Sequence, residues 1–544
     1  MLPRIKLPPN NAALAGLAAL FIVPGLANHD LWKTQDAIGL GIVHAMATSG
    51  DLLLPSIAGE HWLYDQPLYH WVALCFGKLL GSAMQFHAAA RLASGAFVAA
   101  AFALIYFAAR QWSEEDLRRT SGCAALLVLL GCVGLLVHAH EALPELASLT
   151  ATCGALAALP HATRRPLIAG VAFGAALGLA FLAATWIAPA SVAAAVLAAH
   201  FACPEWRTRR IAAFLGIAFS VALAVGVSWP LALALRAPEA FAEWRTILFS
   251  REAPTSVNLR HFVATASWFA WPAWPLAAWT AWSLRARLRE PRLFVPGVAV
   301  LLMVLLCIAW GPPQNENLIP LLAPLALFAT FGIFTLRRGA AGALDWFGAL
   351  AFAVFAGLVW LGYIAMLTGV PGPVARNFSR IAPGFVAQFQ PFALGFAILI
   401  AAAWLYVICC TAHSPLRSLV RWAGGIVLLW GTFAALWMPW VDYQKSYRGV
   451  ALELRSRMPS KPRCISGRGI GVSQAAALDY HGGIRTQAYD ALRPAACPLV
   501  LVQGTAQSEF DAPAAVPGRR WVKLADLARP GDRAERYRLY RLER

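Results

Sequence analysis

Long apolar runs recur along most of this chain, and they restrict the folds that it can adopt. Of its 544 residues, 59% are hydrophobic and 13% are charged, whereas about 25% of the residues in soluble domains are charged. A helix of about 17–25 apolar residues crosses a bilayer. Such runs lie near 12–28, 88–109, 120–138, 143–160, 166–184, 187–203, 211–235, 264–283, 293–310, 318–336, 343–369, 391–411 and 421–440. The sequence therefore predicts an α-helical polytopic membrane protein with about 13 transmembrane helices.

The loops between these runs alternate in charge, which predicts the orientation. Short basic loops such as Arg118-Arg119, Arg164-Arg165 and Arg337-Arg338 follow every second run. Because Lys and Arg gather in cytoplasmic loops, we expect the N-terminus in the cytoplasm of a bacterium and the C-terminal tail in the periplasm, across the inner membrane. The net charge of +18 agrees with this excess of basic residues in cytoplasmic loops. It also favours membrane lipids as partners, because basic residues attract anionic lipid phosphates. No basic–aromatic motif suggests nucleic acid as a partner.

Two regions differ from the apolar runs. Within the transmembrane domain, 1–440, the loop 29–87 is long and faces the periplasm in this topology. Its segments 37–48 and 67–80 have apolar residues at helical spacing but are short for a span, so we expect interfacial helices. Residues 441–544 contain 18 Lys and Arg and 10 Asp and Glu, with short apolar strands and a helix near 473–480. They predict a small periplasmic α/β domain.

The cysteines divide in the same way. Eight lie in apolar runs, where cysteine behaves as a small hydrophobic residue, whereas Cys464 and Cys497 lie in the polar tail. Each lies at the start of a predicted strand, Cys464-Ile465 and Cys497 to Val502, and neighbouring strands are about 4.7–4.9 Å apart, close to the separation that a disulfide needs. Since the periplasm is oxidising, we predict a Cys464–Cys497 disulfide.

Three carboxylates are candidate catalytic groups. Asp36 follows Trp32 at the head of the first interfacial helix, where it would act as a base or as a helix cap. Asp65 precedes Gln66-Pro67 and would orient substrate or begin a helix. Glu145 follows Pro144 at the start of an apolar run, where an ionisable group usually faces a cavity.

Cations on the periplasmic side of this topology are candidate phosphate ligands. Arg91, Arg251, Arg260 and His261 lie there against the positive-inside bias, as phosphate ligands or as interfacial anchors. The run His138-Ala139-His140-Glu141 is loosely spaced for a metal, and no Cys-x-x-Cys spacing occurs, so we expect neither a metal nor a cofactor.

The first loop resembles that of a known family. The motifs, in chain order, are Trp32, Asp36, Met46, Gly50-Asp51, Pro55, Tyr64-Asp65-Gln66-Pro67-Leu68, Trp71, Ala90-Arg91-Leu92, Ser94, Glu145, Gly178-Leu179-Ala180-Phe181-Leu182 and Leu318-Ile319-Pro320-Leu321-Leu322-Ala323-Pro324. Their order and spacing resemble the aminoarabinose transferase and protein O-mannosyltransferase group, which has the GT-C fold. The resemblance covers about residues 10–330. It implies a polyprenyl-phosphate sugar donor, transfer at the periplasmic face and a catalytic acid in the first loop.

The chain departs from this family at three positions. The family's Asp-Glu pair falls on Gln35-Asp36, its Glu-Lys-Pro falls on Asp65-Gln66-Pro67, and a Lys-Gly falls on Ala184-Thr185. Asp36 is thus the acid that is kept, and two lysines are absent. We expect Arg91, Arg251 or Arg260 to bind the donor phosphate in their place. Lys33, Tyr64, Gln66 and His261 complete the expected substrate contacts.

The resemblance implies a glycosyltransferase that moves a sugar from undecaprenyl phosphate to lipid A or another envelope acceptor. Asp36, Glu145 and Asp65 would be its catalytic acids. A transporter of lipid-linked sugars is one alternative. Many transporters are built from internal repeats, and no repeat is evident in this sequence. A non-catalytic family member that binds a carrier lipid is another, because Gln35 and the missing lysines weaken the motif. The sugar, the acceptor and the oligomeric state are not determined by the sequence.

Overall fold

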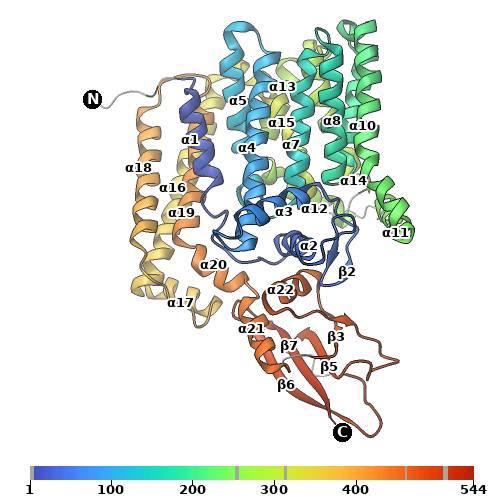
Figure 1. The fold of residues 1–544 in the computed structure, drawn as a ribbon. Helices are drawn as coiled ribbons and strands as arrows, with labels where there is room; N and C mark the ends of the chain where they lie inside the picture. Colours follow the sequence, from blue (N-terminus) through green and yellow to red (C-terminus); the bar gives the residue numbers. More distant parts are fainter. Residues whose placement is uncertain are drawn as a thin grey trace.

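The computed structural model describes residues 5, 7–250, 256–310, 315–459, 462–505 and 513–543. Most of it is a bundle of helices that run side by side (Figure 1). The helices of the bundle are α1 (Asn11–Ile22), α4 (Phe86–Trp112), α5 (Arg118–Leu130), α6 (Leu135–His138), α7 (Pro144–Ala158), α8 (Pro166–Ala183), α9 (Ile187–Ala202), α10 (Arg209–Arg236), α12 (Ser256–Phe269), α13 (Ala273–Ser283), α14 (Pro291–Trp310), α15 (Leu322–Gly332), α16 (Arg338–Thr368), α18 (Pro391–Cys410) and α19 (Arg417–Leu436).

Seven of the described helices are long and apolar enough to cross a membrane, namely α4, α8, α10, α14, α16, α18 and α19. Every predicted span coincides with a helix, but several are shorter than expected. The run 120–138 is divided after Gly131 into α5 and α6, and the run 264–283 is divided at Pro272 into α12 and α13. Gly and Pro commonly interrupt helices. Because these two runs are divided, and because seven described helices are of spanning length, the count of thirteen spans stays a prediction.

The remaining elements cover one end of the bundle, which we call the capped end (Figure 1). The first loop contributes α2 (Gln35–Ser49), the hairpin of β1 (Ser56–Ile57) and β2 (Glu60–His61), and α3 (Leu68–Leu80). The short helices α11 (Pro238–Phe249) and α17 (Gly372–Ile381) connect longer ones. After α19 the chain forms α20 (Met438–Lys445), α21 (Arg448–Arg457) and α22 (Val472–Gly482), with a sheet of β3 (Ile465–Arg468), β4 (Gln487–Ala488), β5 (Leu499–Thr505), β6 (Arg520–Arg529) and β7 (Asp532–Glu543). The predicted domain boundary at 441 falls inside α20.

Two glycines let α2 lie between the bundle and the C-terminal domain. A Cβ at Gly39 would lie 2.2 Å from the carbonyl oxygen of Ala142, just before α7. A Cβ at Gly41 would lie 2.6 Å from the Cβ of Ala476 on α22. Since contacts this close are not tolerated by packed atoms, both positions require glycine. The helix α2 is therefore in direct contact with the bundle on one side and with α22 on the other.

The C-terminal sheet has the order β4-β3-β5-β7-β6. Strand β3 pairs in parallel with β4 and β5, whereas β7 pairs antiparallel with β5 and β6. The sequence predicts β3, β5 and β7 but misses β4 and β6, because β4 is only two residues long and β6 carries charged residues along its length. A helix over 473–480 is predicted, and α22 is found there.

Cys464 and Cys497 are joined by a disulfide, with their Cα atoms 5.3 Å apart. They precede β3 and β5, which pair with Ile465 opposite Leu499. The other eight cysteines are free. The disulfide closes a loop of 33 residues across the parallel half of the sheet.

We expect the denatured, non-reduced protein to be alkylated at the eight free cysteines and not at Cys464 or Cys497. Replacing both with Ser should destabilise the C-terminal domain by about 3–4 kcal/mol, because an open loop of this length gains conformational freedom on unfolding. Mass spectrometry of the alkylated peptides measures the first effect, and limited proteolysis at increasing temperature measures the second. Labelling of both cysteines without reductant would contradict the disulfide and the oxidising compartment that it requires.

Candidate active site

Asp36 lies on the first turn of α2 and is 1% exposed. Its two carboxylate oxygens accept four hydrogen bonds. The Nε and Nη2 atoms of Arg91 on α4 donate at 3.0 and 2.9 Å, and the backbone N–H groups of Trp32 and Ala142 donate at 3.0 and 2.8 Å. A carboxylate has about four lone-pair sites. Asp36 is therefore saturated by the protein itself, at the point where the first loop, α4 and the loop before α7 meet.

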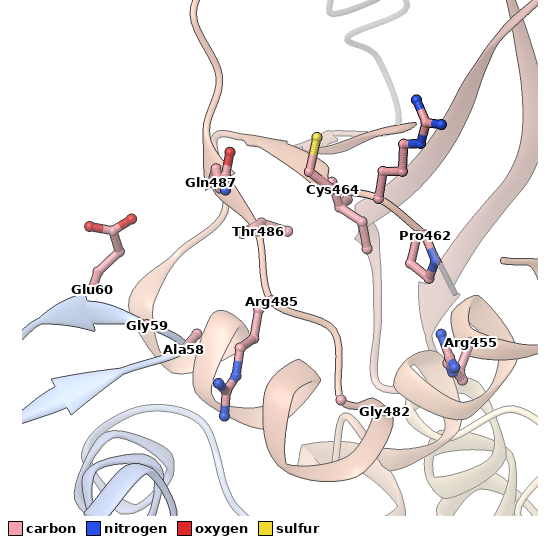
Figure 2. Close-up of a pocket in the computed structure, with 13 residues that line it drawn as sticks. Ala58, Gly59, Glu60, Arg455, Pro462, Cys464, Gly482, Arg485, Thr486 and Gln487 are labelled. Carbon is pink, nitrogen blue, oxygen red and sulfur yellow. The ribbon is translucent and has the colours of Figure 1, made fainter. Parts of the chain in front are cut away.

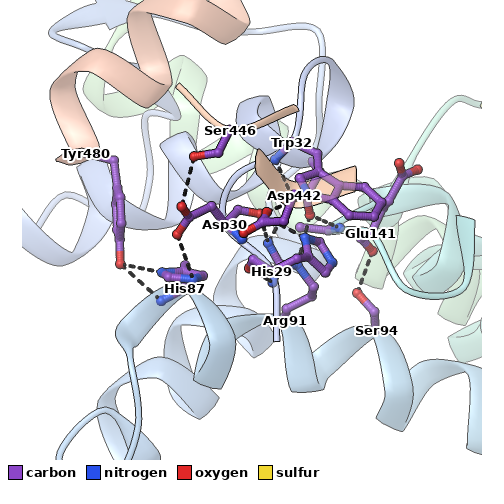
Figure 3. A network of polar contacts seen from close by, with 12 residues as sticks. His29, Asp30, Trp32, His87, Arg91, Ser94, Glu141, Asp442, Ser446 and Tyr480 are labelled. Carbon is purple, nitrogen blue, oxygen red and sulfur yellow. Dashed lines mark hydrogen bonds and ion pairs between the residues drawn. The ribbon is translucent and has the colours of Figure 1, made fainter. Parts of the chain in front are cut away.

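Arg91 is fully buried, at 0% exposure. Besides Asp36, it donates from Nη1 to the carbonyl oxygen of His29 and from Nη2 to that of Asp30, both at 3.0 Å (Figure 3). Burial acts to raise the pKa of Asp36, but the charge of Arg91 together with the hydrogen bonds from Arg91 and Trp32 keeps this pKa below its usual value. Burial is the main cause that lowers the pKa of His29 to about 3, and the charge of Arg91 acts in the same direction.

This arrangement bears on two expected roles. The guanidinium of Arg91 is sealed in the interior, where it donates to Asp36 and to backbone carbonyls. The Asp36 carboxylate accepts from Arg91 and from two backbone N–H groups. Arg91 as a phosphate ligand and Asp36 as a base stay predictions, while the contacts of the pair hold the first loop in place.

A second carboxylate attaches the first loop to α20. Asp442 Oδ1 accepts hydrogen bonds from Asp30 N at 2.9 Å and from Trp32 Nε1 at 2.8 Å. Ser446 Oγ donates to Asp30 Oδ2 at 2.8 Å (Figure 3), and Trp32 and Ser446 form a β-bridge. Burial and the nearby charge of Asp30 raise the pKa of Asp442 to about 6. Sequence reasoning missed this contact, because the two aspartates are 412 residues apart.

Lys33 lies in the same stretch but points to the C-terminal domain. Its Nζ is 3.9 Å from Glu535 Oε2 on β7, and its side chain is 38% exposed. Glu535 is also hydrogen-bonded by Gln474, Gln503 and Tyr537. Lys33 is therefore paired with a carboxylate of the protein, and its contact with substrate stays a prediction.

Asp65 and its neighbours lie in the other half of the loop. Trp62 Nε1 donates to Asp65 Oδ2 at 2.9 Å. Burial raises the pKa of Asp65, and the hydrogen bond from Trp62 opposes this effect. Tyr64 is 61% exposed, with its ring 4.8 Å from that of Trp62. Gln66 is buried at 3% exposure, so of the two neighbours only Tyr64 offers its side chain to solvent.

Glu145 is half-buried on the first turn of α7, directly after Pro144. Among the described residues, the titratable groups of Asp65, Glu316 and His138 act electrostatically on its carboxylate. The backbone N–H of Glu145 itself interacts with this carboxylate, and within the described residues no other residue is found to donate a hydrogen bond to it. Of the three predicted acids, Asp65 and Glu145 are close enough to interact electrostatically, and Glu145 keeps acceptor capacity.

His138 and Glu141 border this acidic group. His138 Nδ1 is 3.0 Å from Glu141 Oε2. His140, by contrast, is buried between the carbonyl oxygens of Phe21 and Leu136, so the His-x-His-Glu run does not converge on one point. In the part of the chain that the structure describes, no group of three or more His, Cys, Asp or Glu side chains is placed to hold a metal. Glu316, in the polar stretch Asn315-Glu316-Asn317, is not among the residues that the sequence predicts for the site.

The remaining predicted cations lie elsewhere or cannot be placed. Arg260 is exposed on α12. His261 belongs to the same helix, but its side chain is outside the described residues, and Arg251 lies outside them altogether. Their contact with substrate stays a prediction.

Known proteins were compared with the whole chain. No family model and no curated sequence matches it. Among solved structures, ArnT from Cupriavidus metallidurans bound to undecaprenyl phosphate is similar, with a TM-score of 0.71 and 15% identity over 97% of both chains. The same protein in the apo state gives 0.70 and 16% over the same share. The chain therefore has the GT-C fold of the aminoarabinose transferase ArnT, as the order of its sequence motifs predicts.

Proposed function

We propose that this protein is a glycosyltransferase that moves a sugar from a polyprenyl-phosphate carrier, such as undecaprenyl phosphate, to an envelope acceptor. One observation carries the proposal: the fold matches ArnT with undecaprenyl phosphate bound, end to end, over 97% of both chains. The candidate acids lie at the capped end of the bundle, where a carrier lipid in the bilayer and a polar acceptor in water would meet. We place this end in the periplasm of a bacterium and the N-terminus in the cytoplasm, as the loop charges predict.

The proposed reaction is a direct displacement. A hydroxyl oxygen of the acceptor attacks the anomeric carbon of the sugar, and the bond from that carbon to the phosphate oxygen breaks. The carrier phosphate leaves with the bonding electrons, and the hydroxyl proton passes to a carboxylate. Glu145 is the base in this proposal, because its carboxylate is half-buried and has acceptor capacity. General-base catalysis of this kind contributes about 10²–10⁴-fold to a rate.

The other candidate residues have supporting roles. Asp65 lies near Glu145 and is held by Trp62, so it would orient the sugar or the acceptor. Tyr64 is exposed beside it and would pack against a sugar ring. Asp36 acts through Arg91 as a positioning residue. We assign the departing phosphate to Arg260, Arg251, His261 or Lys33, since such a leaving group requires a cation.

Removing the gene tests the function directly. We expect mass spectrometry of envelope glycolipids to find one sugar-modified species missing from the deletion strain and restored by the wild-type gene. That species would identify the sugar and whether the acceptor is lipid A or another molecule. Unchanged glycolipids in every growth condition that expresses the protein would contradict the proposal.

A non-catalytic protein that binds a carrier lipid is the second candidate. It is favoured by Gln35 at the first acid of the family's pair and by the saturation of Asp36 by Arg91. The two candidates differ in turnover. With purified protein in nanodiscs and a radiolabelled polyprenyl-phosphate sugar, a protein that only binds the carrier would leave the label on the donor, whereas a transferase would move it to the acceptor. A transporter is less favoured, because Asp65 and Glu145 lie at one end of the bundle and not at mid-membrane.

A further inference from the structure

A separate polar cavity of about 590 Å³ lies where the hairpin of the first loop meets the C-terminal domain (Figure 2). One wall is Ala58, Gly59 and Glu60. The opposite wall belongs to the C-terminal domain and includes Arg455, Arg463 and Arg485. Pockets of about 300–1,000 Å³ hold small ligands. This cavity has room for a group of the size of one or two sugars, and the residues named for the transfer reaction do not line it.

The lining of the cavity is positively charged. Three arginines contribute to it from α21, from the segment before β3 and from the segment after α22, and Glu60 is the acid among its lining residues. Arg485 is held in place because its Nε donates to both oxygens of Asp479 at 3.0 and 3.1 Å. The domain around the cavity has 18 Lys and Arg against 10 Asp and Glu over 441–544. Such a surface attracts anions.

The shape of this site is fixed by the fold. Cys464, which lines it, is bonded to Cys497. Gly59 and Gly483 line opposite sides with φ values of +98° and +60°, a conformation that favours glycine. They present backbone in place of side chains, which leaves the space between the arginines open.

The hairpin connects this cavity to the candidate active site. Glu60 is five residues from Asp65, and five extended residues span at most about 18 Å. Trp62, between them, donates from its backbone N–H to Pro55 O at 2.9 Å and from Nε1 to Asp65 Oδ2 at 2.9 Å. A ligand in the cavity would thus lie within the length of a short oligosaccharide from Asp65.

We propose that this cavity binds a phosphate-bearing saccharide, through the planar guanidinium groups that suit phosphate oxygens. If the protein transfers a sugar as proposed above, this saccharide is the polar part of the acceptor. The ligand is either the head group of a membrane glycolipid or a soluble sugar phosphate, since both have the same chemistry.

The test uses the full-length protein in nanodiscs of neutral lipid, with glucose 1-phosphate as the probe. We expect saturable binding by calorimetry, and no binding of glucose. Arg463→Gln and Arg455→Gln should each weaken binding about tenfold or more, as expected for loss of one charge-assisted hydrogen bond. Arg457→Gln is the matched control, because Arg457 is on α21 with Arg455, has a 57% exposed side chain and does not line the cavity. It should bind as wild type.

Competition then separates the two sources. Displacement of the probe by a phosphorylated glycolipid in the nanodisc, and not by its dephosphorylated form, assigns the site to a head group, whereas displacement by soluble sugar phosphates alone assigns it to a free ligand. Absent binding of glucose 1-phosphate, or equal binding by all three variants and wild type, would overturn the proposal. The assay contains no sugar donor, so its result is independent of whether the protein is a transferase.

Discussion

Replacing Glu145 with Gln should lower sugar transfer by about 10²–10⁴-fold while leaving the protein folded. The amide keeps the size of the side chain but cannot take the proton from an attacking hydroxyl. Glu145 has no hydrogen-bonded partner within the described residues whose loss would disturb the fold, so its replacement should act on the reaction. The measurement is the amount of sugar-modified glycolipid in a deletion strain that expresses the variant, with the protein level determined in the same membranes.

Glu239→Gln is the matched control, because Glu239 is exposed on the first turn of α11 and the chemical change is the same. It should restore the glycolipid fully. Asp65→Asn should have a smaller effect than Glu145→Gln, since Asp65 orients a ligand in this proposal. Wild-type product from a normally expressed Glu145→Gln protein would show that another group accepts the proton.

Breaking the pair of Asp36 and Arg91 should destabilise the protein by about 3–5 kcal/mol, because either single replacement leaves an unpaired charge in the interior. Both side chains are buried, at 0% exposure each. Asp36→Leu and Arg91→Met test the two halves, and thermal unfolding in detergent gives the change in stability. The double variant should lose less than the sum of the single variants, since it leaves no buried charge.

An exposed pair provides the comparison. Arg457 and Glu453 on α21 form an ion pair with side chains 57% and 50% exposed, and such pairs contribute about 0–1 kcal/mol. Their replacement should leave the unfolding temperature nearly unchanged. If the losses for Asp36→Leu and Arg91→Met simply added in the double variant, the two residues would not be coupled and the positioning role of Asp36 would be wrong.

The sequence by itself determined most of the helices of this protein and three strands of its C-terminal sheet. Runs such as 88–109, 211–235 and 391–411 became α4, α10 and α18, because a long apolar run forms a helix whatever its neighbours are. The segments at 37–48 and 67–80 became the short helices α2 and α3 for the same local reason. The strands that begin near Cys464 and Cys497 could also be predicted, because a short apolar strand between polar residues is a local pattern.

The tertiary structure decided which groups the charged side chains contact. The sequence placed Arg91 at the start of a span and Asp36 at the start of a helix. These positions are compatible with Arg91 as a phosphate ligand and Asp36 as a base, and equally with an ion pair between the two. Packing brought these residues, 55 positions apart, within 2.9 Å of each other in the interior. It likewise paired Asp30 with Asp442 and Lys33 with Glu535, and it placed Glu145 within electrostatic range of Asp65. Local sequence sets the helices and strands, whereas the partner of a buried charge depends on which distant segments exclude water from it.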